Sequence, residues 1–73
     1  MTARSRIKYI HEGKYVAEVD VALIEDESAW SPYLSLEDAE KLEDVRVALA
    51  RGDIVAASKQ SRVYTLQPIA AAG

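Results

Sequence analysis

The stretch SLEDAEKLEDVRVALARG, Ser35 to Gly52, decides the fold because it contains residues typical of both ends of a helix. Ser35 is a favourable N-cap residue, since its hydroxyl can accept a hydrogen bond from a free backbone N–H of the first turn. Asp38 stands where the acidic residue of a capping box belongs, although Glu or Gln is usual there. Gly52 can adopt the left-handed conformation that closes a helix. The pattern predicts one helix, and Asp44 offers an alternative cap at which a second helix could restart.

The predicted helix has one apolar side and one charged side. With about 100° of rotation per residue, the apolar arc collects Ala39, Leu42, Val45, Leu49 and Ala50. Charged residues fill the opposite arc, where Glu37 and Lys41 form a favourable pair one turn apart. Such a helix packs its apolar side on the core.

Two strands are predicted before the helix, over Arg6–Glu12 and Lys14–Glu25. In the second, every odd position from 15 to 23 is apolar, which predicts that this side faces the core: Tyr15, Ala17, Val19, Val21 and Leu23. A two-residue turn at Glu12-Gly13 would set Lys8 beside an apolar residue. A three-residue loop over residues 12–14 instead pairs Ile7 with Val19 and Tyr9 with Ala17, so we predict the three-residue loop.

After the helix, Asp53 can cap a short second helix over Ile54–Gln60, and Arg62–Gln67 reads as a third strand that Pro68 ends. We therefore predict one α+β domain over residues 1–73, in the order β-β-α-α-β, with residues 1–5 and 69–73 frayed. It has a mainly antiparallel three-stranded sheet, with the main helix on one face. The predicted core is Ile7, Tyr9, Ala17, Val19, Val21, Leu23, Leu42, Val45 and Leu49.

Composition narrows the class of function. The net charge of −3 argues against general nucleic-acid binding, which depends on neutralising phosphates. The chain has no cysteine, so it can form neither a disulfide nor a thiolate metal site. It has no apolar run near the roughly 20 residues of a membrane span and no secretory h-region, and we expect a cytoplasmic protein.

The residues needed for catalysis are not grouped in the sequence. His11 is the sole histidine, and a triad or zinc site needs companions that the chain lacks. The carboxylates of Glu40, Glu43 and Asp44 fall on or beside the solvated side of the helix. The sequence thus predicts no enzyme, and no catalytic, metal, cofactor or small-molecule site. That interpretation would change if His11 lay beside two carboxylates in a pocket.

The loop before the helix holds the candidates for partner binding, Trp30, Pro32 and Tyr33. Large aromatic residues dominate interface hot spots, so these residues can anchor a protein partner. Trp30 and Tyr33 can instead form a lid over the small core. So small a domain gains stability from a partner or a second copy, and a short sheet has open edges. We expect a protein-interaction module that self-associates or binds another protein.

The alternative function is nucleic-acid contact through the basic residues Arg4, Arg6, Lys8 and Arg62. It requires the first and third strands to lie side by side. The basic residues before position 9 can also be a solvated arm.

Three segments together resemble small bacterial proteins that occur with toxin–antitoxin-type gene pairs. They are HEGKYVAEVDVALIED, WSPYLSLEDAEKLEDVRVALARGD and SRVYTLQPI, and the resemblance covers about residues 7 to 69. It implies a cytoplasmic, antitoxin-like protein that neutralises a partner, with no catalytic residues. The chain differs from ribbon-helix-helix antitoxins, in which one basic strand precedes two helices. Here a hairpin comes first, and it carries Glu18 and Asp20.

Overall fold

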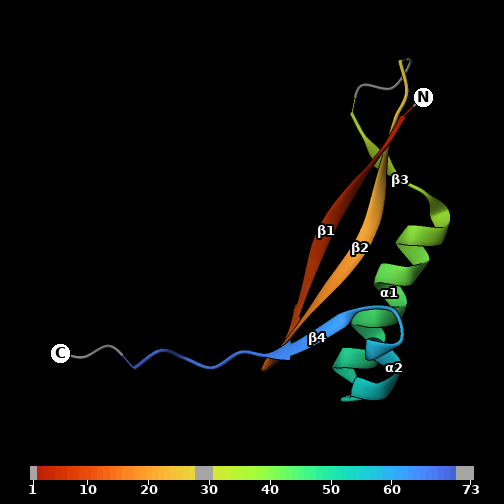
Figure 1. Ribbon diagram of the computed structural model, residues 1–73. Helices are drawn as coiled ribbons and strands as arrows, with labels where there is room; N and C mark the ends of the chain where they lie inside the picture. Colours follow the sequence, from red (N-terminus) through yellow and green to blue (C-terminus); the bar gives the residue numbers. More distant parts are fainter. Residues whose placement is uncertain (1, 28–30, 71–73) are drawn as a thin grey trace.

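The protein has an α+β fold in which helices lie on one side of an antiparallel sheet (Figure 1). The computed structural model describes residues 2–27 and 31–70. Within them the elements are β1 (Thr2–Glu12), β2 (Tyr15–Glu25), β3 (Tyr33–Leu34), α1 (Leu36–Ala50), α2 (Ile54–Ser58) and β4 (Arg62–Thr65). The predicted class and order are confirmed, with β3 as an added short strand in what we expected to be a loop.

β2 is the central strand of the sheet. Its whole length pairs with β1 on one side. On the other side, residues 15–18 pair with β4 and residues 23–24 pair with β3. β1 and β4 therefore lie on opposite sides of β2.

The hairpin register differs from the predicted one. Glu12 pairs with Tyr15 across a two-residue turn, Gly13-Lys14, so Ile10 lies opposite Ala17 and Lys8 opposite Val19. Gly13 has φ +58°, and no non-glycine residue of the described chain has positive φ. Glycine with positive φ at the first turn position is typical of a type II′ turn, whose twist matches that of paired strands. The predicted loop was wrong because it did not weigh this turn.

The changed register moves part of the predicted core to the surface. Ile7 and Tyr9 pair with Asp20 and Glu18, on the face away from α1, and are 47% and 65% exposed. The observed core consists of Ala17, Val19, Val21, Val45, Ala48, Leu49 and Ala57, with Leu42 partly buried against it. Leu23 is also only partly buried. The core is thus the β2 side facing α1, with α2 closing one end.

The helix ends follow the sequence closely. The Ser35 hydroxyl accepts a hydrogen bond from the Asp38 N–H at 3.1 Å, which confirms the N-cap. At the other end Gly52 has φ +73°, its N–H donates to the Leu49 carbonyl and the Asp53 N–H donates to the Ala48 carbonyl. This is the Schellman arrangement. α1 is continuous through Asp44, so the alternative restart does not occur.

The short elements end earlier than predicted. The Asp53 carboxylate accepts from the Ala56 N–H at 3.1 Å, which confirms the cap of α2, but this helix ends at Ser58. β4 ends at Thr65, and the following residues run away from the body (Figure 1). Ile69 in this tail is 94% exposed.

The molecule is extended for its size. Its radius of gyration is 15.1 Å, whereas about 11 Å is expected for a compact chain of 73 residues. The exposed surface is 5527 Å², against about 4,500 Å² for a compact monomer of 8.0 kDa. The long hairpin, its single helical layer and the tail after β4 all contribute to this excess.

The observed register can be tested by truncating side chains on the two faces of the hairpin. Val21→Ala and Leu49→Ala remove buried methyl groups and should each lower the free energy of unfolding by about 1–4 kcal/mol. Ile7→Ala removes a half-exposed side chain and should lower the free energy of unfolding clearly less than either of these two substitutions. Urea unfolding followed by circular dichroism measures all three. An Ile7→Ala loss equal to that of Val21→Ala would contradict the register.

Candidate interaction surface

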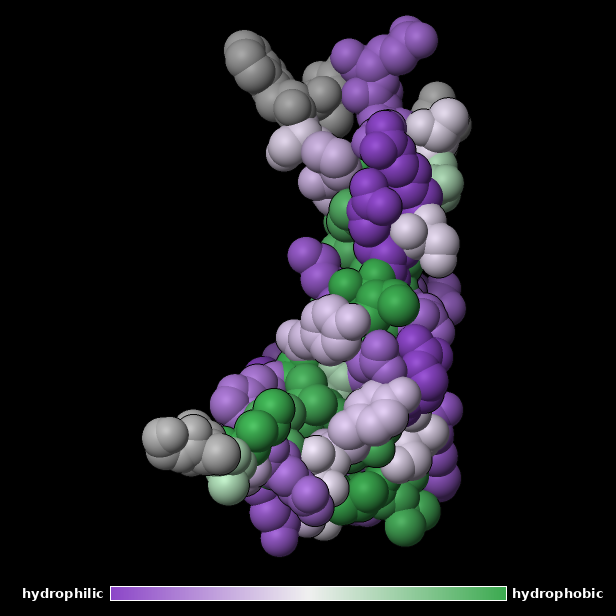
Figure 2. Space-filling view, turned by 60° about the vertical axis from the view of Figure 1, so that its left-hand side comes forward, coloured by the Kyte–Doolittle hydropathy of each residue, from purple (hydrophilic) through white to green (hydrophobic). Residues whose placement is uncertain are grey.

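The sheet has one face that no helix covers, which we call the open face. It consists of the even-numbered residues of β2 and the residues that pair with them. Its exposed large side chains are Ile7 (47%), Tyr9 (65%), Tyr33 (45%) and Tyr64 (49%). Figure 2 looks toward this side of the molecule, where apolar and aromatic side chains gather near the base of the tail and hydrophilic ones lie above them. Exposed aromatic groups of this kind favour contact with a protein.

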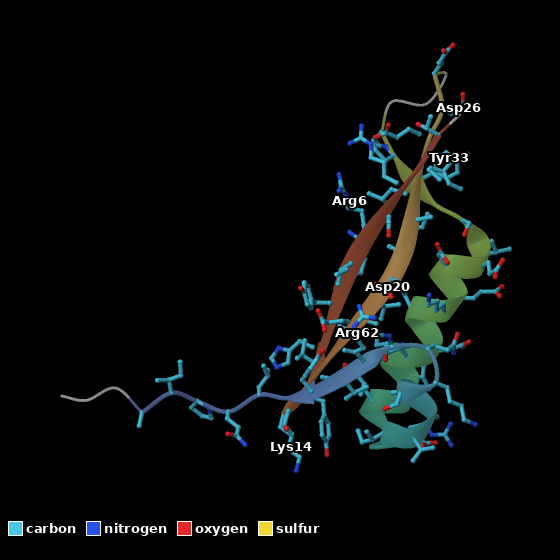
Figure 3. The ribbon with its side chains drawn as sticks, in the orientation of Figure 1. Arg6, Lys14, Asp20, Asp26, Tyr33 and Arg62 are labelled. Atoms are coloured by element: carbon cyan, nitrogen blue, oxygen red, sulfur yellow. The ribbon has the colours of Figure 1, made fainter. Side chains whose placement is uncertain are left out.

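An ion-pair network lies in the middle of the open face. The Arg62 guanidinium donates two hydrogen bonds to the Asp20 carboxylate, at 2.9 and 3.0 Å, and lies 3.5 Å from Glu18 (Figure 3). The hydrogen bonds from Arg62 hold the pKa of the Asp20 carboxyl below its ordinary value. The neighbouring Glu18 carboxylate raises the pKa of Tyr64. Arg62 thus forms ion pairs with two carboxylates of its own chain.

One edge of the sheet is closed by side chains of α1. Between its pairings with β4 and β3, β2 leaves residues 19–22 without a partner strand. There the Ala22 N–H donates to the Asp38 carboxylate at 2.8 Å, and the Lys41 ammonium donates to the Asp20 carbonyl at 2.6 Å. Asp38 and Lys41 lie about one helical turn apart and replace the missing strand. One N–H and one C=O of the β2 edge thus find partners on α1.

The other edge of the sheet is β1, an 11-residue strand whose outer side pairs with nothing in the described chain. Arg4 pairs with Glu25 at 3.0 Å. Arg6 and Lys8 make no ion pair with any described residue. The Arg6 side chain lies clear of α1 on the outer side of β1 (Figure 3). β1 thus offers unpaired backbone and unpaired positive charge.

The predicted partner-binding residues are only partly placed. Trp30 lies outside the described residues. Pro32 is exposed, and Tyr33 pairs with Ile24, which sets it at one end of the open face. Ile7, Tyr9 and Tyr64 belong to the same face, but the sequence prediction missed them. A type II′ turn at Gly13 was the signal that would have placed Ile7 and Tyr9 there.

The structure does not bring the predicted nucleic-acid residues together. Arg62 pairs with Glu18 on the open face, whereas Arg4, Arg6 and Lys8 share the opposite side with the odd residues of β2. The whole of β2 separates the two sets, so the required neighbouring strands are absent within the described chain.

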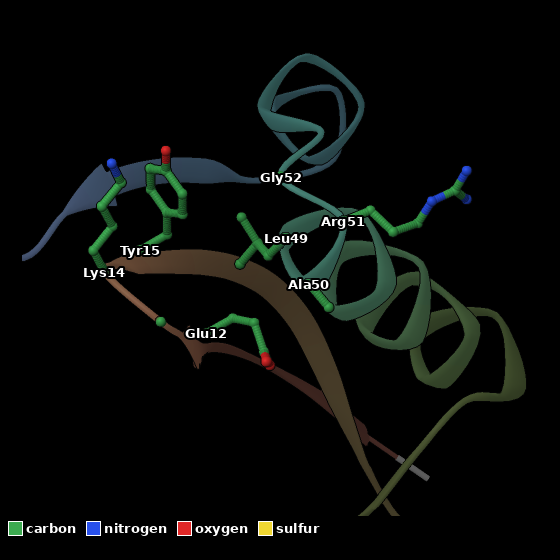
Figure 4. A pocket seen from close by; sticks show the side chains of 8 residues that line it. Glu12, Lys14, Tyr15, Leu49, Ala50, Arg51 and Gly52 are labelled. Carbon is green, nitrogen blue, oxygen red and sulfur yellow. The ribbon is translucent and has the colours of Figure 1, made fainter.

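A cavity of about 400 Å³ lies between the hairpin turn and the end of α1 (Figure 4). Glu12, Lys14, Tyr15 and Arg51 contribute to its wall, and the Lys14 ammonium lies 5.4 Å from the centre of the Tyr15 ring. His11 does not line it, and its Nε2 lies 2.9 Å from the Gly13 carbonyl oxygen. No group of metal ligands occurs in residues 2–27 and 31–70.

A scan against protein-family models and searches among curated proteins and solved structures each found no match to this chain. Neither helix of the described chain has the length and apolarity to cross a membrane.

The contact between α1 and the β2 edge can be tested with Asp38→Ala. The variant leaves the partly buried Ala22 N–H without an acceptor, which should cost about 1–2 kcal/mol of stability. Glu37→Ala is the matched control, because it removes the same charge from the same turn at an exposed position. If both variants lowered the free energy of unfolding equally, the effect would come from the charge near the helix N-terminus and not from the contact with Ala22.

The Asp20–Arg62 pair should make stability depend on acid pH. Because the folded pKa of Asp20 is lowered, its contribution is present above about pH 4 and is lost as the pH falls through the folded value. The stability difference between the parent and Asp20→Asn should therefore be largest near neutral pH and shrink below pH 4. Urea titrations at a series of pH values measure this difference. A difference that stays constant with pH would contradict the assignment.

Proposed function

We propose that the protein is a protein-interaction module of the cytoplasm, which binds its partner through the open face. The observation that carries the proposal is the exposure of Tyr9, Tyr64, Tyr33 and Ile7 on a sheet face without a covering layer. Desolvating such side chains favours binding, since aromatic residues bury a large area and make well-defined contacts.

The charges of this face also favour a protein over a nucleic acid. Arg62, its central cation, is neutralised by Asp20 and Glu18. A phosphate backbone would have to compete with these carboxylates, on a chain whose net charge is −3. A protein partner needs only to cover the exposed rings of Tyr9, Tyr33 and Tyr64, and it can leave the ion pairs intact.

The resemblance to proteins of toxin–antitoxin-type gene pairs extends the proposal. It implies that the partner is another small protein, which this chain neutralises by covering it. The antitoxin-like part rests on that resemblance alone, whereas partner binding rests on the open face.

The test is co-purification of the untagged protein from its native cell, followed by sizing of the complex. We expect a partner to accompany the parent and to be lost from a Tyr9→Ser, Tyr64→Ser double variant. Leu36→Ser is the matched control, because Leu36 is 75% exposed but belongs to α1. Circular dichroism confirms that each variant folds. Recovery of the parent as a lone monomer, or retention of the partner by the double variant, would refute the proposal.

A further inference from the structure

The outer edge of β1 is the part of the sheet that the fold leaves incomplete. Alternate residues of an edge strand present their N–H and C=O groups outward, where they can pair with another strand. Proteins usually shorten or cover such edges. Here β2 has its free edge filled by Asp38 and Lys41, while β1 stays uncovered over its full length, Thr2–Glu12.

The charges along β1 are arranged so that the strand complements itself. On the side shared with the odd residues of β2, the order is Arg4, Arg6, Lys8, Ile10 and Glu12. The strand is basic at its start and acidic at its end. On α1, Arg46 pairs with Glu43 and also interacts electrostatically with Glu12, which makes no direct ion pair with a described residue. An antiparallel second copy would bring each acidic end to a basic stretch.

Two antiparallel β1 strands related by a two-fold axis can pair in several registers, which differ in the residue that lies on the axis. When Ile7 lies on the axis, Arg6 of one copy faces Lys8 of the other. When Lys8 lies on the axis, the two copies of Lys8 face each other. Like charges therefore oppose in both registers. With Ile10 on the axis Lys8 faces Glu12, but only residues 8–12 pair. With Tyr9 on the axis Arg6 faces Glu12 twice, no like charges oppose, and residues 6–12 pair. Of the two registers in which no like charges oppose, the Tyr9 register has the longer pairing.

We propose that two copies of this chain join through antiparallel β1 strands, with Tyr9 on the two-fold axis and Arg6 paired with Glu12 of the second copy. This inference goes beyond the proposed function, because the chain pairs with itself along β1 and leaves the open face available to another protein. The two open faces become one continuous surface, with the two Tyr9 rings adjacent and Ile7 opposite His11 of the second copy.

The register is tested by disulfide trapping in the full-length chain, which has no native cysteine. Arg6→Cys and Glu12→Cys are made as separate variants, mixed and oxidised. In the proposed register residues 6 and 12 lie directly opposite, within the roughly 7 Å between Cα atoms that a disulfide allows. The same residue in the two copies lies about 20 Å apart. We expect a covalent dimer from the mixture and none from either variant alone.

A charge exchange gives a second, reversible readout. Arg6→Glu and Glu12→Arg should each weaken dimer formation about tenfold, because like charges then face each other. The double variant restores opposite charges and should recover the parent's association in sedimentation equilibrium. Lys59→Glu is the control, since Lys59 follows α2 and is exposed.

The outcomes separate this inference from the proposed function. A parent that sediments as an 8.0 kDa monomer at tens of micromolar overturns the dimer, while co-purification with another protein would still support the interaction module. A dimer that cross-links through Lys8→Cys and Glu12→Cys, but not through residues 6 and 12, overturns the register. A trapped dimer together with rescue by the double charge exchange supports the inference.

Discussion

The backbone conformation of Gly13 is the constraint on which the rest of the structure depends. Its positive φ allows the chain to reverse in two residues, and the turn fixes which residues of β1 and β2 lie opposite one another. Since side chains alternate between faces, a shift of one residue would exchange the two faces of β1. The observed register puts Ile10 beside the core and Ile7 with Tyr9 on the open face. The position of the aromatic surface thus follows from one turn.

The fold satisfies one side of the sheet and leaves the other incomplete. α1 supplies the apolar layer under β2 and also closes its edge through Asp38 and Lys41. Nothing in the described chain performs either task for the open face or for the outer edge of β1. A domain of this size buries little apolar surface, so groups left exposed represent stability that an assembly can still gain.

The open face combines exposed aromatic side chains with a central ion-pair network in which Asp20 and Glu18 balance the charge of Arg62. Arg62 connects β4 to Asp20 and Glu18 of β2, so the network also fixes β4 against the central strand. Its ion pairs are exposed and therefore add modestly to stability. In the proposed interaction these ion pairs leave Arg62 without free positive charge, so Tyr9, Tyr33 and Tyr64 are the contacts that the open face offers to a partner.

The sequence by itself determined the features that depend on neighbouring residues. Ser35, Gly52 and Asp53 set the helix ends through local hydrogen bonds and backbone conformation, and the odd positions of β2 marked its buried side. Only the tertiary structure decided what depends on contacts across the chain. The β1 register needed the turn geometry at Gly13, the separation of Arg62 from Arg6 and Lys8 needed the strand order, and the roles of Asp38 and Lys41 needed α1 against the β2 edge. These pairings join segments distant in sequence, and no local pattern specifies which of them the folded chain satisfies.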